Sequence, residues 1–173
     1  MKTISNGLKL AALAAALALA ACTTKPEAEN TTPPPAPMTS APPVTQSSIV
    51  PGSAEDLRVN VGDTVHFEYN KYDVLDPDKA TLQRQAAWLA KYPSVRVTIE
   101  GHCDERGTRE YNLALGARRA NAVKEYLVSL GVSSARVDTI SYGKERPICT
   151  DSNESCWAQN RRGVTTVTAG PSS

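Results

Sequence analysis

The sequence is poor in aromatic residues, in cysteine and in long apolar stretches. Aromatic residues make up 5% of the 173 positions, with a single phenylalanine, and four cysteines are too few for a disulfide-rich scaffold. The only long apolar run spans residues 10–21 and has 12 residues, whereas a membrane-spanning helix needs about 20. These shortages exclude a polytopic membrane protein and a small cystine-rich domain.

Neither sign of charge is in surplus. The chain carries 19 Lys and Arg against 18 Asp and Glu, for a formal net charge of +1. A nucleic-acid binder usually has a basic surplus gathered on one face. The composition therefore gives no support to nucleic acid as a partner.

The first 22 residues have the pattern of a secretory signal that ends at a lipidation site. Lys2 and Lys9 flank a short polar region, an Ala/Leu-rich segment follows, and the segment ends in L-A-A-C at 19–22. This ending resembles the bacterial lipobox, in which the cysteine is acylated and residues 1–21 are removed. A plain signal peptide with a chance cysteine is the alternative. Several acyl chains on Cys22 anchor stably, and Thr23 differs from the aspartate of an inner-membrane retention signal. We therefore expect an outer-membrane anchor with the domain in the periplasm.

Residues 22–59 are predicted to be a lipid anchor and a disordered, proline-rich linker. Eight of the 12 prolines fall between Pro26 and Pro51, among Thr, Ala, Ser and Glu. Such a segment buries too little apolar surface to offset its ordering entropy. Proline extends it by about 3.1 Å per residue, which suits a spacer between a membrane and a layer below it. A proline-rich ligand of an SH3-type domain is the alternative.

Residues 60–168 are predicted to form one α+β domain, with 169–173 as a tail. Alternating apolar residues predict strands at 65–69, 95–101, 137–142 and 164–168. Three- and four-residue apolar spacing predicts long helices at 76–92 and 109–130, and a short helix is expected at 154–160. Asp76 is the expected N-cap of the first helix, and Gly131 is the expected C′ residue of the second. The order is β-α-β-α-β-(α)-β.

Polar residues gather where the second strand meets the second long helix. Asp104 lies in the connecting loop, and Asn112, Leu115 and Arg119 share one stripe of the helix. Asp104 and Arg119 have two interpretations: an internal salt bridge, or the two ends of a pocket for a zwitterion. The pocket predicts that alanine at either position removes binding while the domain stays folded. The salt bridge predicts a loss of stability in each variant.

The same segment resembles a known family. The run G-H-C-D-E-R-G-T-R-E-Y-N-L-A-L-G-A-R-R-A-N-A-V at 101–123, with Y-N-K-Y-D at 69–73 and N-R-R at 160–162, is similar to the OmpA C-terminal-like domain. The resemblance implies a sheet with helices packed on one face and non-covalent binding of meso-diaminopimelate in the peptidoglycan stem peptide. It implies that the ligand's ammonium and carboxylate are held by Asp104 and Arg119. The pocket lining that it implies is Asn112, Leu115, Tyr69, Asn70 and Tyr72.

Within the family, the lipobox and linker make the chain most similar to lipoproteins of the Tol-Pal system. This resemblance implies TolB and other Tol-Pal components as partners, with a role in envelope integrity and in constriction during cell division. Two departures from the family pattern stand out: Tyr69-Asn70 replaces Phe-Asp, and Cys103 replaces Thr. Asn70 lacks the negative charge of aspartate, and Cys103 is a weaker hydrogen-bond donor.

The remaining cysteines and histidines suggest no catalytic chemistry. Cys149 and Cys156 bracket a six-residue loop, and in an oxidising compartment we expect them to form a disulfide. A metal site built from these two with His102 and Cys103 is the alternative, although no C-x-x-C or H-x-x-H spacing supports it. No nucleophile motif such as G-x-S-x-G is present. We expect a binding module rather than an enzyme, without cofactor or metal.

Overall fold

A computed structural model describes residues 49–171. The predicted signal peptide, Cys22 and most of the predicted linker lie outside these residues. The elements in chain order are α1 (Ala54–Asp56), the π-helix η1 (Leu57–Val61), β1 (Thr64–His66), α2 (Asp76–Lys91), β2 (Arg96–His102), α3 (Arg109–Ser129), the 3-10 helix η2 (Ser134–Arg136), β3 (Val137–Gly143), α4 (Glu154–Asn160) and β4 (Arg162–Ala169). Within the described part of the chain, no helix has the length and apolar character needed to span a bilayer.

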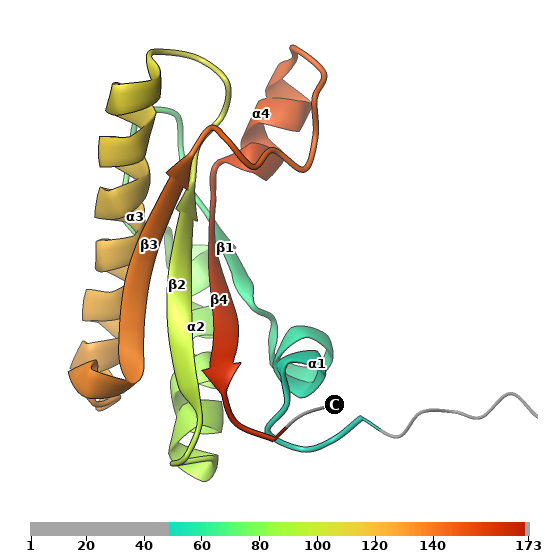
Figure 1. The fold of residues 1–173 in the computed structure, drawn as a ribbon, viewed down its shortest axis with the longest axis vertical. Coiled ribbons are helices and arrows are strands. Elements are labelled where there is room, and N and C mark those ends of the chain that lie inside the picture. Colours follow the sequence, from blue (N-terminus) through green and yellow to red (C-terminus); the bar gives the residue numbers. More distant parts are fainter. Residues whose placement is uncertain (1–48, 172–173) are drawn as a thin grey trace, which may run out of the picture. The chain divides into compact units, whose positions relative to one another are not determined.

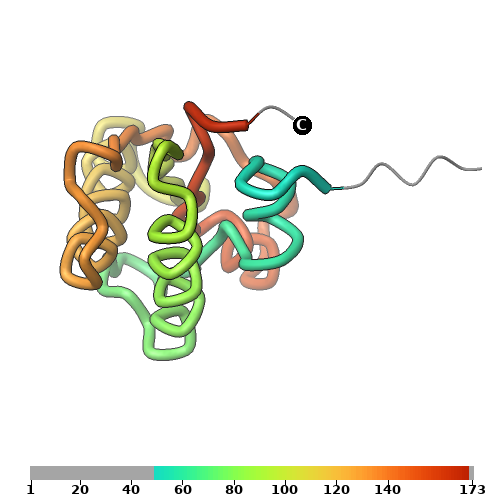
Figure 2. The backbone as a smooth tube through the Cα atoms, turned by 90° about the horizontal axis from the view of Figure 1, so that it is seen from below, coloured from blue at the N-terminus to red at the C-terminus, as the bar shows by residue number. Residues whose placement is uncertain are grey.

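The four strands form one mixed sheet in the order β1-β4-β2-β3. β2 and β3 run parallel, while β4 is antiparallel to both β1 and β2. The long helices α2 and α3 cover one face of this sheet, and α4 lies beyond the end where β2 finishes (Figures 1 and 2). The predicted α+β class, the order of elements and the packing of helices on one face are confirmed.

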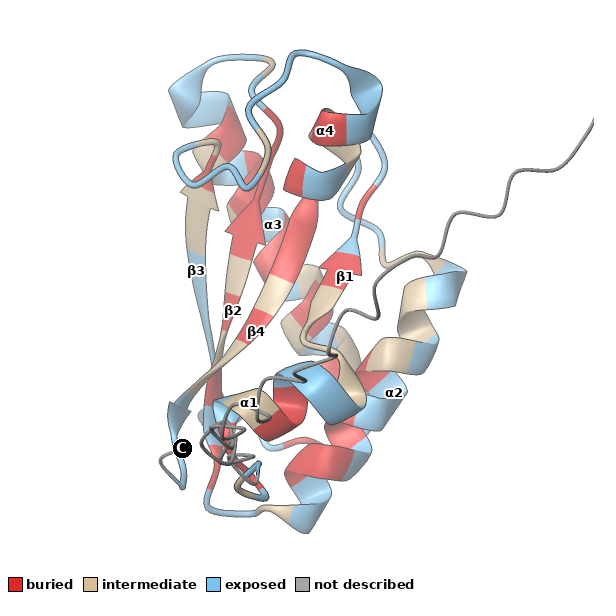
Figure 3. Cartoon of the chain, turned by 90° about the vertical axis from the view of Figure 1, so that its right-hand side faces the viewer, coloured by how far each residue is buried: buried red, intermediate tan, exposed pale blue. Residues whose placement is uncertain are grey.

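The core fills the space between the sheet and the two long helices, where Figure 3 shows buried residues on both surfaces. Its fully buried side chains include Leu82, Leu89, Val97, Ile99, Val123 and Leu127. Near the end of β2 the backbones of Gly101 and Gly116 approach closely. A Cβ on Gly101 would lie 1.9 Å from the Gly116 carbonyl oxygen. Only glycine therefore lets α3 sit this close to β2, and this contact fixes the loop that carries Asp104.

The bounds of α3 and α4 match the sequence prediction well. The Thr108 side chain caps α3 by accepting from the Tyr111 amide at 3.2 Å, and Gly131 has a φ of 97° just after the helix. The N-cap predicted for α2 is wrong by one residue. Leu75 holds that position because its carbonyl accepts the first helical bond, from the Lys79 amide at 3.1 Å, and Asp76 is already helical.

The first strand is shorter than predicted. The alternation of apolar residues continues to Tyr69, but β1 ends at His66 and the chain then turns. The turn is closed by a 3.2 Å bond from the Lys71 amide to the Glu68 carbonyl, and Asn70 adopts a left-handed φ of 57°. Asparagine tolerates this conformation better than most residues. The consequence is a loop that projects backbone carbonyls toward α3.

The folded domain begins earlier than residue 60. Residues 54–61 form α1 and η1, although the sequence predicted a linker up to residue 59. Asp56 holds these residues to the rest of the domain, because its carboxylate accepts hydrogen bonds from the Gly52 amide at 2.8 Å and from Trp88 Nε1 at 2.9 Å. Hydrogen bonds from Asn60, Gly52 and Trp88, in that order of importance, lower the pKa of Asp56. Long-range partners thus order a segment whose composition is that of a linker.

Both ends of the described chain lie at the same end of the sheet (Figure 1). Gly52 packs near Tyr92 and Pro171, and Arg96 at the start of β2 pairs with Ala169 at the end of β4. The loop that follows β2 is at the opposite end, beside α4. The entry of the chain into the domain and the Asp104 loop are therefore separated by the length of the strands.

Candidate functional site

A small pocket lies between the loop after β1, the loop after β2 and the first turns of α3. Its volume is about 180 Å³. The residues that line it are Tyr69, Asn70, Cys103, Asp104, Arg106, Gly107, Tyr111, Asn112, Leu115 and Arg119. Six of the seven predicted peptidoglycan-binding residues therefore meet at one pocket, which we call the candidate pocket.

Asp104 is a buried carboxylate with two guanidinium partners. Its Oδ2 accepts from Arg106 Nη2 at 2.5 Å and from Arg161 Nη1 at 3.3 Å, and its Oδ1 accepts from the Arg106 amide at 3.1 Å. Burial by itself would raise the pKa of Asp104, but the hydrogen bonds and charge of Arg106, aided by Arg161, outweigh it. The pKa therefore lies below its usual value of 3.8, and the group is ionised at neutral pH.

Arg119 holds the two loops together from inside the domain. The residue is fully buried, and its guanidinium donates to the carbonyls of Lys71 at 2.8 Å, Glu68 at 3.0 Å and His102 at 2.8 Å. Burial lowers the pKa of Arg119, but an arginine remains charged at any physiological pH. Of the five N–H groups of arginine, three are used in this way, and the Cys103 side chain lies beside the same guanidinium.

Asp104 and Arg119 do not pair with each other. Within residues 49–171 no ion pair joins them, because Asp104 is bound by Arg106 and Arg161 while Arg119 is bound by backbone carbonyls. The direct salt bridge that the alternative interpretation required is thus not the arrangement in the structure. The two side chains instead present opposite charges to the same pocket.

Arg106 is part of the site, although the sequence did not single it out. Its guanidinium lies between two aromatic rings, 4.0 Å from the centroid of Tyr69 and 4.0 Å from that of Trp157. Cation–π contacts of this kind orient the group as well as stabilise it. Trp157 comes from α4 and is far away in the sequence, so no local pattern could have revealed this cage.

The helical stripe predicted from spacing is present. Asn112 and Leu115 are buried, and Asn112 Nδ2 donates to the carbonyls of Arg106 at 2.8 Å and Thr108 at 3.0 Å. Asn112 therefore shapes the loop around Asp104. Leu115 is 5% exposed and supplies an apolar wall.

Comparison with known proteins decides the family. The model of the OmpA family matches residues 66–161. The peptidoglycan-associated lipoprotein of Rhizobium meliloti (strain 1021) is 48% identical over 96% of this chain and 91% of its own length. This chain belongs to the OmpA family. The peptidoglycan-associated lipoprotein of Pseudomonas aeruginosa is 45% identical over 89% of this chain and 93% of its own.

A solved structure has the same OmpA-family fold. The crystal structure of the peptidoglycan-associated lipoprotein from Burkholderia pseudomallei matches with a TM-score of 0.60 and 43% identity, over 61% of this chain and 90% of that chain. The match supports the OmpA-like fold predicted from the sequence motif.

The structure shows the contacts of the three residues that depart from the OmpA-family pattern. Tyr69 keeps an aromatic wall and stacks on Arg106, and Asn70 accepts a hydrogen bond from the Tyr111 hydroxyl. Cys103 is a buried, free thiol whose Sγ contacts the Asn112 carbonyl at 3.3 Å. Burial raises the pKa of Cys103 to about 11, so the thiol is neutral.

One predicted pocket residue lies elsewhere. Tyr72 does not line the candidate pocket but a second, larger groove farther along α3. The reason is the turn at 68–71, which directs Tyr69 and Tyr72 to different places. Tyr111, which the sequence analysis did not select, lines the pocket instead.

Cys149 and Cys156 are joined in a disulfide, with Cα atoms 5.3 Å apart. We expect alkylation of the denatured, unreduced chain to label Cys103 but neither Cys149 nor Cys156. After reduction both should react, which peptide mass spectrometry resolves. Closing so short a loop is expected to add about 2 kcal/mol to the free energy of unfolding. Labelling of both residues without reductant would contradict the pairing.

Proposed function

We propose that this chain is an outer-membrane lipoprotein whose periplasmic domain binds peptidoglycan without covalent chemistry. The observation that carries the proposal is the placement of Asp104 and Arg119 on one small pocket without a bond between them. meso-Diaminopimelate presents an ammonium and a carboxylate on the same carbon. A carboxylate pairs with the Arg119 guanidinium, which lines the pocket from its buried side, and the ammonium pairs with Asp104.

Arg106 already occupies the carboxylate that the ligand ammonium would bind. Asp104 already holds the Arg106 guanidinium through both of its oxygens, so the ammonium must share the carboxylate or displace that contact. Arg106 is 28% exposed at its side chain and lies 3.8 Å from the Glu154 carboxylate. It can therefore move outward while it keeps an anionic neighbour.

The same proposal places the chain between two layers of the envelope. Acylated Cys22 holds the chain in the outer membrane, the proline-rich segment spans the distance from the membrane to the cell wall, and the domain binds peptidoglycan. The names of its relatives, which describe lipoproteins associated with peptidoglycan, support this reading. TolB and other Tol-Pal components are the proposed protein partners, acting in envelope integrity and in constriction at division. The residues of the pocket offer charge and hydrogen bonds but no activated nucleophile, which supports a binding role over an enzymatic one.

Sedimentation with purified sacculi tests the proposed function. The processed chain in detergent is expected to pellet with diaminopimelate-type sacculi and to be released by a free stem tripeptide that ends in meso-diaminopimelate. A tripeptide that ends in lysine lacks the side-chain carboxylate and should compete at least about tenfold less well, given about 1.5–3 kcal/mol for a charged hydrogen bond. A chain that stays in the supernatant, or equal competition by the two peptides, would contradict the proposal.

A further inference from the structure

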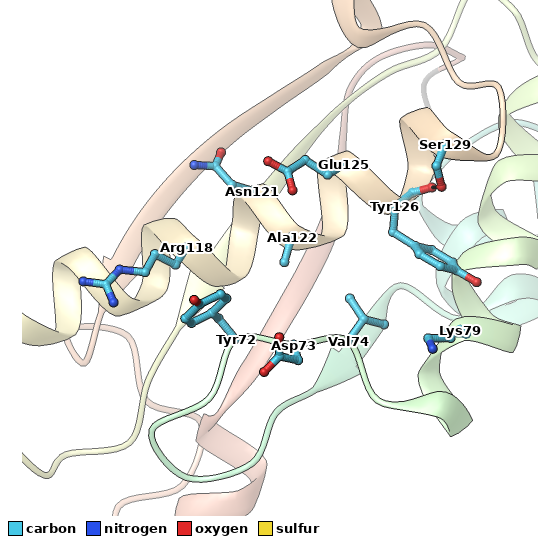
Figure 4. Close-up of a pocket in the computed structure, with 10 residues that line it drawn as sticks. All are labelled: Tyr72, Asp73, Val74, Lys79, Arg118, Asn121, Ala122, Glu125, Tyr126 and Ser129. Carbon is cyan, nitrogen blue, oxygen red and sulfur yellow. Dashed lines mark hydrogen bonds between the residues drawn. The ribbon is translucent and has the colours of Figure 1, made fainter.

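A second and larger hollow runs along α3 next to the candidate pocket. It lies between α3 and the loop that leads into α2, and its volume is about 740 Å³ (Figure 4). We call it the α3 groove. Its lining consists of Tyr72, Asp73, Val74, Lys79, Arg118, Asn121, Ala122, Glu125, Tyr126 and Ser129. Its size is within the usual range of small-molecule sites, about 300–1,000 Å³.

The groove continues the track that begins at the candidate pocket. Both hollows are bounded by the same loop and by the same helix, with Tyr69 and Leu115 in the pocket and Tyr72 and Ala122 in the groove. Leu115 and Ala122 are seven residues apart, so they lie on one side of α3 and about 10 Å apart along its axis. Arg118 lies between these two positions on α3, with its guanidinium 5.9 Å from the centroid of the Tyr72 ring, so a ligand that extends from the pocket into the groove passes beside this contact.

The chemistry of the groove suits a neutral, hydroxyl-rich ring. Tyr72 is 43% exposed and offers an aromatic face, and the small side chain of Ala122 points from α3 toward the opposite loop (Figure 4). Asp73 lies beside Tyr72 on the loop, and Glu125 lies on the helix. Within residues 49–171 the Tyr72 hydroxyl and these two carboxylates make no internal hydrogen bond, so they are free to bind ligand hydroxyls.

The groove carries a small net negative charge. Asp73 and Glu125 are opposed by Arg118, whereas Lys79 already pairs with Asp76 at 2.6 Å, so the lining as a whole does not favour an anion. Aromatic, acidic and basic groups around a nearly neutral space match an uncharged N-acetylated sugar. The ring packs on Tyr72, carboxylates accept from its hydroxyls, and Arg118 donates to its acetyl carbonyl.

We infer that the α3 groove binds the glycan strand of peptidoglycan, while the candidate pocket binds the stem peptide. The inference rests on the proposed function, since it extends the same ligand. A lactyl group and two stem residues separate the sugar from diaminopimelate. Two extended residues span about 7 Å, and the lactyl group supplies the remainder of the roughly 10 Å between the two places on α3.

Calorimetry with three ligands tests the inference with the processed chain in detergent. The ligands are a disaccharide-tripeptide, the sugar-free tripeptide, and glycan strands freed of peptide by an amidase. We expect the disaccharide-tripeptide to bind at least tenfold more tightly than the tripeptide, and the bare glycan to bind measurably. Equal affinity of the two peptides, or no binding of bare glycan, overturns the glycan assignment. Failure of the tripeptide alone to bind instead overturns the proposed function.

Variants of the groove locate the glycan contacts. Tyr72→Ala and Glu125→Ala are expected to remove glycan binding, and Glu125→Ala should leave the affinity for the tripeptide unchanged. Asp138→Ala is the matched control, because Asp138 is an exposed carboxylate on β3 away from both hollows. Circular dichroism checks that each variant is folded. Glycan binding that survives both groove variants contradicts the assignment.

Discussion

Arg119→Ala is expected to unfold much of the domain at physiological temperature and not merely to empty the pocket. The guanidinium is fully buried and satisfies the carbonyls of Glu68, Lys71 and His102. Each unsatisfied buried group costs about 1–3 kcal/mol, and a cavity adds to that sum. The total approaches the 5–15 kcal/mol by which small domains are typically stable. The expectation from sequence, that this variant stays folded, is therefore revised.

Thermal denaturation separates the two roles of Arg119. Arg119→Lys keeps a positive charge and can reach one or two of the carbonyls, so it should melt between the native chain and Arg119→Ala. It should still bind sacculi poorly, because an ammonium cannot hold a carboxylate in the bidentate manner of arginine. Arg118→Ala is the control for stability, since Arg118 is the exposed neighbour on the same helix. An alanine variant that melts within a few degrees of the native chain would refute the structural role of Arg119.

Asp104→Asn is expected to keep the fold and lose binding. The amide oxygen of asparagine can still accept from the Arg106 backbone, which now bonds Asp104 Oδ1 at 3.1 Å. The negative charge that pairs with a ligand ammonium is gone, and a charged hydrogen bond contributes about 1.5–3 kcal/mol. Affinity for sacculi should therefore fall at least about tenfold. Asp138→Asn is the matched control, and it should pellet like the native chain.

The pH dependence of binding has a definite sign. Because the pKa of Asp104 lies below its usual value of 3.8, the carboxylate stays charged from neutral pH down to about pH 5. Its contribution to stability is present above the pKa of the unfolded chain and is lost as pH falls through the lower, folded value. Sedimentation of the native chain should accordingly be constant between about pH 7 and 5 and decline only in stronger acid. A decline within that range would implicate a group other than Asp104.

The sequence predicted those elements whose signals are local. The helix α3 was placed correctly because its apolar stripe repeats every three to four residues and Gly131 follows it. The helix α1 and the π-helix were missed because their anchor, the bond from Trp88 to Asp56, joins residues 32 positions apart. The end of β1 was misplaced because the turn at 68–71 is held by hydrogen bonds from Arg119, which lies about fifty positions downstream.

The residues of the site divide in the same way, into those with a local sequence signal and those placed by long-range contacts. Asp104, Asn112, Leu115 and Arg119 could be chosen because their spacing on a loop and a helix is set by local geometry. The partners of Asp104 could not, since Arg161 is 57 positions away and the ring of Trp157 reaches Arg106 only through the packing of α4. The order of strands in the sheet, β1-β4-β2-β3, likewise depends on contacts between distant segments.

The placement of the chain entry and the pocket at opposite ends of the sheet has a mechanical consequence. Under the proposed function, a pull on residue 49 against a ligand held at the pocket is directed along β1, β2 and β4. Such a pull loads the hydrogen bonds between neighbouring strands together in shear, whereas a pull across the strands would load them one at a time. We therefore expect the domain to withstand more force along this direction than across its strands, as the proposed link between two envelope layers requires.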